Sequence, residues 1–156
     1  MPDRSIMFVC SGNVCRSPMA EYLLRYRLGA DSGWAISSAG VSAPSGMSAS
    51  AAAIDVLKEL GIDLRRHRSR PLIKEQIETA SMIVVMTAFH YEQIRSLFPD
   101  AAGNVYLMKS FDPEAEGNDV NDPIGSSVDV YREIRDEINA ALPGLIKYMK
   151  TFGEKD

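Results

Sequence analysis

A thiol and a guanidinium stand close together near the start of the chain, in the stretch Val9-Cys10-Ser11-Gly12-Asn13-Val14-Cys15-Arg16-Ser17-Pro18. Five residues separate Cys10 from Arg16, which is enough to curl the backbone around one tetrahedral dianion. The loop N–H groups and the Arg16 fork can then hold the non-reacting oxygens of a phosphate. The same positive field favours the thiolate form of Cys10, and Ser17 can donate a hydrogen bond to it. This spacing predicts phosphoryl transfer onto sulfur.

The elements on either side fit an anion-binding loop. Residues 5–9 form an apolar run that predicts a buried strand. Ser17 is the expected N-cap and Pro18 the expected first residue of a helix that ends before Gly29. A strand, a loop containing Gly12 and Asn13, and a helix N-terminus direct N–H groups and a positive dipole end at one anion.

Strand and helix patterns alternate through the rest of the chain. We expect strands at 34–38, 81–86 and 104–108, and helices at 49–60, 74–80, 87–98 and 127–150. This alternation predicts one domain over residues 1–156, an α/β three-layer sandwich with a four-stranded parallel sheet and helices on both faces. Pro143 should kink or split the last helix, and residues 154–156 should form a frayed tail.

Composition excludes several classes of protein. The net charge of −4 argues against a nucleic-acid partner, and no apolar run approaches the length that spans a membrane. The two cysteines are too few for a disulfide scaffold, and with only two distant histidines they do not predict a zinc site. We therefore expect a cytoplasmic protein with no metal and no cofactor.

Two polar segments carry further charged side chains. Four arginines between Arg65 and Arg70 either bind an anion or form a solvated basic turn, and the turn is the favoured interpretation. The long loop from 109 to 126 follows the fourth strand, so it can reach the carboxyl edge of the sheet where ligands bind. It carries three aspartates that could serve as a general acid, namely Asp112, Asp119 and Asp122.

The opening stretch resembles the signature of the low-molecular-weight protein-tyrosine phosphatases, and the order of later segments extends the resemblance over essentially the whole chain. Those segments are Ser37-Ser38-Ala39-Gly40, the turn at His67, the strand ending at Met86, and Asp122-Pro123. The resemblance implies a phosphocysteine mechanism on a phosphorylated protein, with Cys10 as nucleophile and Asp122 as general acid and base. The phosphate-binding residues it implies are Ser11, Gly12, Asn13, Val14, Cys15, Arg16 and Ser17.

The resemblance also implies a supporting network. Asn13, Ser17, Ser38 and His67 would be joined by hydrogen bonds that hold the loop in shape. A solvated His67 on an exposed turn is the alternative that residue types alone leave open.

Two departures from the family pattern bear on the substrate. Ile124 and Gly125 follow Asp122-Pro123 where relatives acting on phosphotyrosine often carry an aromatic pair. The bacterial branch that includes protein-arginine phosphatases is similar around Asp122 but has Thr at the position of Val14. Since valine cannot hydrogen-bond a guanidinium nitrogen, phosphotyrosine is the favoured substrate and phosphoarginine the alternative.

Other functions on the same scaffold are weaker interpretations. No cysteine follows Cys15, so the electron relay of an arsenate reductase cannot run within this chain. A phosphate-binding module without turnover is disfavoured because Cys10, Arg16 and a candidate acid are all present. Cys15 is either a packed residue or a partner for a reversible disulfide with Cys10, and we expect a monomer or weak dimer.

Overall fold

The computed structural model describes residues 4–153, and the expected tail at 154–156 lies outside them. The strands are β1 (Arg4–Cys10), β2 (Trp34–Gly40), β3 (Met82–Val85) and β4 (Val105–Leu107). The helices are α1 (Arg16–Leu28), α2 (Ala51–Lys58), α3 (Lys74–Thr79), α4 (Ala88–Leu97) and α5 (Val128–Lys150). Short 3-10 helices occupy Pro99–Asn104, Met108–Phe111 and Thr151–Gly153.

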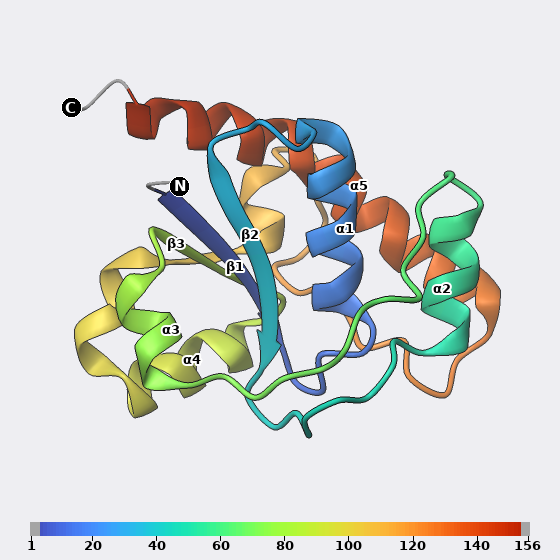
Figure 1. Ribbon diagram of the computed structural model, residues 1–156, viewed down its shortest axis with the longest axis horizontal. Coiled ribbons are helices and arrows are strands. Elements are labelled where there is room, and N and C mark those ends of the chain that lie inside the picture. Colours follow the sequence, from blue (N-terminus) through green and yellow to red (C-terminus); the bar gives the residue numbers. More distant parts are fainter. Residues whose placement is uncertain (1–3, 154–156) are drawn as a thin grey trace.

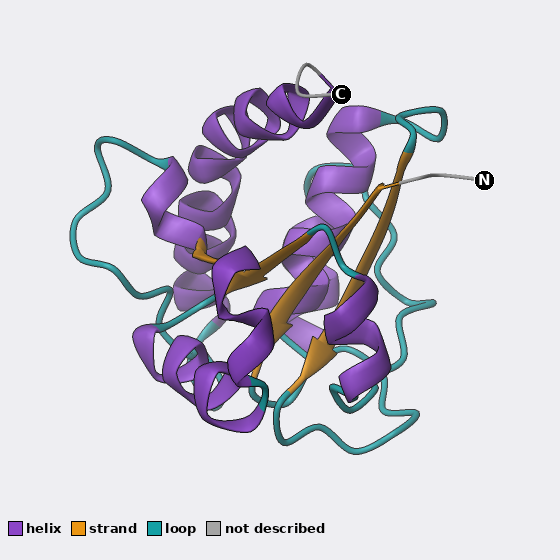
Figure 2. Ribbon diagram, turned by 90° about the vertical axis from the view of Figure 1, so that its left-hand side faces the viewer, coloured by secondary structure: helices purple, strands orange, loops and turns teal. Residues whose placement is uncertain are grey.

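The four strands form one parallel sheet in the order β2-β1-β3-β4. Helices α1, α2 and α5 cover one face, and α3 and α4 cover the other (Figures 1 and 2). The predicted α/β sandwich with a four-stranded parallel sheet is therefore confirmed. Cys10 closes the central strand β1, opposite Gly40 at the end of β2.

From Ile6 to Cys10, strand β1 is buried on both faces, which explains the unbroken apolar sequence of this part. Ile6 and Phe8 pack into the apolar layer under α1 and α5, whereas Met7 and Val9 pack into the layer under α3 and α4. A strand packed on both faces has little freedom to shift. It therefore holds Cys10 at a fixed point on the carboxyl edge of the sheet.

One local prediction is wrong, and a second is wrong in part. Helix α1 begins at Arg16 with Cys15 as its N-cap and no side-chain cap, so Ser17 lies inside the first turn. Of the kink or split expected at Pro143, the split is wrong, because helix α5 runs through this residue without a break. Leu142 and Leu145 on either side are fully buried, and this packing outweighs the hydrogen bond that proline cannot donate.

Candidate active site

The loop that joins β1 to α1 has the backbone of an anion cradle. Asn13 has φ 57°, the only positive value among the non-glycine residues of the described chain. The N–H groups of residues 12–15 donate to no other described residue. Gly40 makes room for the loop, because a Cβ there would lie 2.4 Å from the Ser11 carbonyl oxygen. Free amides at a helix N-terminus favour a bound anion.

The thiol of Cys10 faces the first turn of α1. Its Sγ lies 2.9 Å from the Ser17 hydroxyl oxygen, and Cys10 is only 2% exposed. The Ser17 hydroxyl thus lies against the sulfur instead of capping the helix, and its O–H can stabilise a thiolate. Ser17 is the second residue of α1, so its hydroxyl binds the thiol from within the first helical turn.

Asn13 is the centre of a buried hydrogen-bond network. Its side-chain Nδ2 donates to the Ser17 hydroxyl at 2.8 Å and to the Ser38 hydroxyl at 3.0 Å. His67 Nε2 donates to the Asn13 carbonyl oxygen at 2.7 Å, and the Arg70 backbone N–H donates to Asn13 Oδ1 at 3.0 Å. These bonds oppose the cost of the left-handed backbone at Asn13 and so hold the loop in its curled shape.

The solvated alternative for His67 is wrong, since this side chain is only 5% exposed. Burial lowers the pKa of His67, which favours a neutral ring that keeps its proton on Nε2 for the Asn13 carbonyl. The turn around it is joined to the end of β2, where Gly40 N–H donates to the Arg70 carbonyl oxygen at 3.0 Å and Leu72 N–H donates to the Gly40 carbonyl oxygen at 2.9 Å.

Glu21 completes the network and was not predicted. Its Oε1 accepts a 2.6 Å hydrogen bond from the Ser38 hydroxyl, and its Oε2 lies 2.9 Å from Arg25 Nη2. Glu21 follows Ser17 by one helical turn on the same face of α1. That spacing is the signal that could have identified it as a member of the network.

The guanidinium of Arg16 is held by the long loop that precedes α5. Its Nη1 donates to the Val120 carbonyl oxygen at 3.0 Å, and its Nη2 lies 3.7 Å from Asp122 Oδ2. The Nε of this buried guanidinium has no hydrogen-bond partner among the residues that the structure describes. A buried donor without an acceptor is costly in a folded protein, so this atom marks the place of an anionic ligand.

Asp122 reaches the site because its loop is attached to β3. The Val120 N–H donates to the carbonyl oxygen of Met86 at 2.8 Å. Asp122 Oδ1 accepts the Ile124 N–H at 3.0 Å, which leaves Oδ2 turned toward Arg16. Cys10, Arg16 and Asp122 line one small cavity of about 40 Å³. Of the other candidate acids, Asp112 lines a different cavity, and Asp119 Oδ1 accepts the Ala88 N–H at 2.8 Å.

The family model "Low molecular weight phosphotyrosine protein phosphatase" matches residues 5–155. The chain belongs to this family. It is a phosphoric monoester hydrolase, and the Cys-x5-Arg loop of the family is the stretch from Cys10 to Arg16.

Several relatives of this phosphatase are similar over almost their full length. A protein-arginine-phosphatase of Geobacillus stearothermophilus is 42% identical, and the match covers 97% of this chain and 99% of the relative. A probable low molecular weight protein-tyrosine-phosphatase of Ralstonia nicotianae is 32% identical, with 96% and 99% covered. Among solved structures, a low molecular weight protein tyrosine phosphatase from T. tengcongensis has TM-score 0.86 and 36% identity, with 93% and 99% covered.

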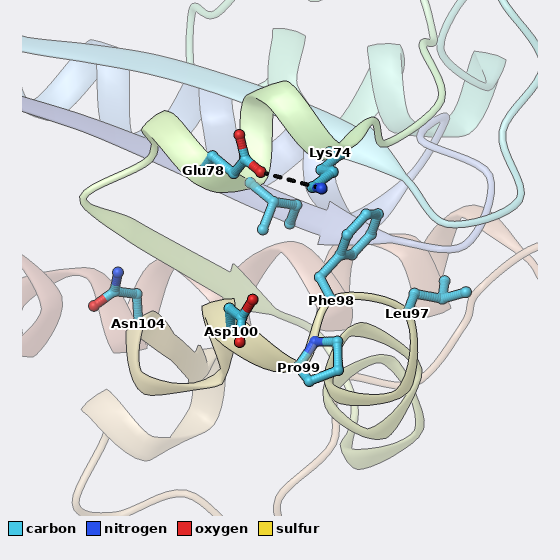
Figure 3. Close-up of a pocket in the computed structure, with 8 residues that line it drawn as sticks. Lys74, Glu78, Leu97, Phe98, Pro99, Asp100 and Asn104 are labelled. Carbon is cyan, nitrogen blue, oxygen red and sulfur yellow. Dashed lines mark ion pairs between the residues drawn. The ribbon is translucent and has the colours of Figure 1, made fainter.

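A larger cavity of the phosphatase lies away from the catalytic loop. It has a volume of about 350 Å³ and opens between α3 and the junction of α4 with the following 3-10 turn (Figure 3). Lys74 and Glu78 pair along one wall at 3.6 Å. Among residues 4–153, no three His, Cys, Asp or Glu side chains are placed to hold a metal ion. No helix within those residues combines the length and apolar character needed to cross a membrane.

His90 is a neighbour of the catalytic loop that the sequence did not reveal. It is 1% exposed, its Nε2 lies 2.8 Å from the Ser11 hydroxyl oxygen, and its Nδ1 lies 3.0 Å from the Thr87 hydroxyl oxygen. Burial, with a contribution from the Arg16 charge, lowers the pKa of His90 to about 4. Helix α4 thus supports the phosphatase loop through a neutral imidazole.

This lowered pKa predicts a loss of stability in mild acid. The unfolded chain binds the His90 proton near pH 6.5, so between pH 6.5 and 4 it holds more protons than the folded chain. The free energy of unfolding should therefore fall by about 2 kcal/mol between pH 7 and pH 5 through His90, and His67 acts in the same direction. Urea unfolding of wild type and His90→Gln at both pH values measures this, and equal pH dependence in the two proteins would contradict it.

Proposed function

We propose that this phosphatase hydrolyses phosphotyrosine on proteins through a phosphocysteine intermediate. The observation that carries the proposal is the single cavity lined by Cys10, Arg16 and Asp122. A nucleophile, a clamp for the equatorial oxygens and a proton donor are the three groups that a two-step phosphoryl transfer requires.

In the first step Cys10 Sγ attacks phosphorus in line, the S–P bond forms and the bond to the phenolic oxygen breaks. Asp122 donates its proton to the departing oxygen, so tyrosine leaves as the neutral phenol. Arg16 Nε and the free N–H groups of residues 12–15 donate to the equatorial oxygens. Because the network around Asn13 fixes these donors beforehand, little free energy is lost in reorganising them.

In the second step water attacks the phosphocysteine. Asp122, now ionised, accepts a proton from that water, the S–P bond breaks, and inorganic phosphate leaves with the thiolate restored. The Ser17 hydroxyl at 2.9 Å from sulfur stabilises the thiolate as leaving group in this step, as it does the nucleophile in the first.

The walls above the phosphate site favour an aryl leaving group. Val14 and Ile124 both line the catalytic cavity, and Ile124 is 61% exposed. Phe89 is 65% exposed and lies beside His90, its ring centroid 6.2 Å from the imidazole. The apolar side chains of Val14 and Ile124 suit a phenol ring and offer a guanidinium no hydrogen-bond acceptor.

Phosphoarginine is the second candidate, because the Geobacillus stearothermophilus relative at 42% identity is named a protein-arginine-phosphatase. Under this alternative Asp122 would donate its proton to the guanidinium nitrogen that leaves. The same loop and the same nucleophile serve both leaving groups, so the residues at the mouth decide between them.

Val14→Thr tests the choice of substrate. A hydroxyl at this position should raise the ratio of kcat/KM on phosphoarginine to kcat/KM on phosphotyrosine peptides by about fivefold, because one added hydrogen bond contributes about 1 kcal/mol. Val14→Ala is the control, since it removes apolar bulk and adds no hydroxyl. An unchanged ratio in Val14→Thr would refute the role of Val14, and a wild-type preference for phosphoarginine would refute the proposed substrate.

We further propose a single-domain, cytoplasmic enzyme that acts as a monomer or weak dimer on phosphoproteins without a nucleic-acid partner. Both cysteines are free thiols, and a catalytic thiolate needs a reducing compartment. A reversible Cys10–Cys15 disulfide remains a hypothesis. It would require Cys15 Sγ to leave the Tyr131 hydroxyl, which lies 3.3 Å away, and burial raises the pKa of the Cys15 thiol.

A further inference from the structure

A second cavity lies on the other side of Asn13 from the catalytic one. Its volume is about 320 Å³, and none of its lining residues lines the cavity over Cys10. Ser38 and His67, two members of the loop network, form part of its wall. Asn13 contacts both of them and also lines the catalytic cavity. One residue therefore connects the two cavities.

The wall of this second cavity is strongly basic in a protein of net charge −4. Four guanidinium groups line it, those of Arg25, Arg66, Arg68 and Arg70, together with the single carboxylate of Glu21. Arg25 is paired with that carboxylate at 2.9 Å. Within residues 4–153, the other three arginines form no ion pair with a carboxylate.

Two of these three unpaired guanidiniums are held in place by uncharged backbone carbonyl groups. Arg70 Nε donates to the Ser38 carbonyl oxygen at 2.9 Å. Arg68 Nη1 donates to the carbonyl oxygens of Arg65 and His67 at 2.9 and 2.7 Å. Carbonyl oxygens orient a guanidinium without cancelling its charge, and most of its N–H donors stay available. The side chains thus lose less conformational entropy when an anion binds.

Arg65, in the same turn, shows the opposite arrangement. Its Nε and Nη2 each lie 2.9 Å from a carboxylate oxygen of Asp63, and it lines a different cavity. The basic run is therefore divided into one neutralised arginine and three that keep their charge at one cavity.

We propose that the cavity lined by Arg66, Arg68 and Arg70 is a second phosphate-binding site, distinct from the catalytic loop. Clustered guanidiniums bind tetrahedral dianions through charge-assisted hydrogen bonds. The phosphate is either free inorganic phosphate or a phosphoryl group carried by a protein.

Occupancy of this site is coupled to the catalytic loop through Arg70. The guanidinium of Arg70 holds Ser38, and its backbone N–H holds the side chain of Asn13. A phosphate bound to Arg70 therefore acts on Asn13, whose left-handed backbone gives the catalytic loop its shape. Coupling of this kind is reciprocal, so an anion in the catalytic loop changes the affinity of the second site by the same factor.

Titration with inorganic phosphate at constant ionic strength, followed by amide NMR shifts, tests the proposal. In wild type, the amides of residues 66–70 and those of residues 11–15 should respond with different midpoints. In the double variant Arg66→Gln/Arg68→Gln, the midpoint for residues 66–70 should rise at least about fivefold, as expected for losing charged hydrogen-bond donors. The response of residues 11–15 should persist, which also verifies folding, and Arg65→Gln should titrate like wild type.

Three results would overturn the second site. In the first, the amides of residues 66–70 of wild type do not respond to phosphate. In the second, they share the midpoint of residues 11–15 in both wild type and the double variant. In the third, Arg65→Gln weakens binding as much as the double variant does.

A parallel titration of Cys10→Ser with a phosphoserine peptide identifies the source of the phosphate. A lower midpoint for the peptide than for inorganic phosphate supports a site for a phosphoprotein, and the reverse order supports a site for the free anion.

Discussion

Replacing Cys10 by serine is expected to lower kcat/KM on an aryl phosphate by about 10⁴-fold or more, the scale seen when an enzyme's nucleophile is removed. The serine hydroxyl occupies the same point at the end of β1, but it is not ionised at neutral pH. Acid quenching during turnover, followed by mass spectrometry, should show one phosphoryl group on the Cys10 peptide of wild type.

Cys15→Ser is the matched control, since it changes the other thiol of the same loop. It should still form the intermediate, because the Cys15 thiol is hydrogen-bonded to Ser50 and Tyr131. The Ser17 hydroxyl lies against Cys10 instead. A phosphoryl group found on Cys15, or turnover retained in Cys10→Ser, would contradict the assignment of the nucleophile.

Asp122→Asn should lower kcat on a phosphotyrosine peptide by about 10²- to 10⁴-fold, the usual contribution of a general acid. Asparagine is isosteric and keeps an oxygen for the Ile124 N–H, so the loop should hold its shape. The loss should be much smaller on para-nitrophenyl phosphate, whose leaving group departs without protonation. Steady-state rates on both substrates measure the difference.

The chain offers a close control for this substitution. Asp112 also precedes a proline, and its Oδ1 accepts the N–H of Glu114 at 3.0 Å, as Asp122 Oδ1 accepts that of Ile124. Asp112→Asn therefore changes the same local turn at a place outside the catalytic cavity. Turnover close to wild type is expected, and a loss equal to that of Asp122→Asn would overturn the choice of acid.

Much of the architecture could be predicted because its signals are local. The apolar residues of β3 are buried on both faces, as their unbroken run indicates. Gly29 ends α1 with φ 78°, and Ser127 caps α5 by accepting the Val130 N–H. Each of these features depends on residues that are close together in the sequence, so a sequence pattern is enough to predict it.

Features that depend on distant partners could not be predicted. Ser17 has the sequence of a helix cap, but the thiol of Cys10 takes its hydroxyl once β1 and α1 pack together. His90 is a single histidine in a helical pattern, and its partner Ser11 lies 79 residues away in the chain. The place of the Arg70 side chain likewise depends on a distant partner, since its Nε donates to the carbonyl oxygen of Ser38, 32 residues away in the chain.

The anchoring of Arg16 on the Val120 carbonyl joins two points that are 104 residues apart in the sequence. During synthesis, a chain that has emerged as far as β3 contains the nucleophile and the whole phosphate loop. It still lacks Val120, which holds the guanidinium, and Asp122, the proposed proton donor. We therefore expect catalytic competence to arise only late in translation, so that a truncated or unfinished chain does not act on phosphoproteins.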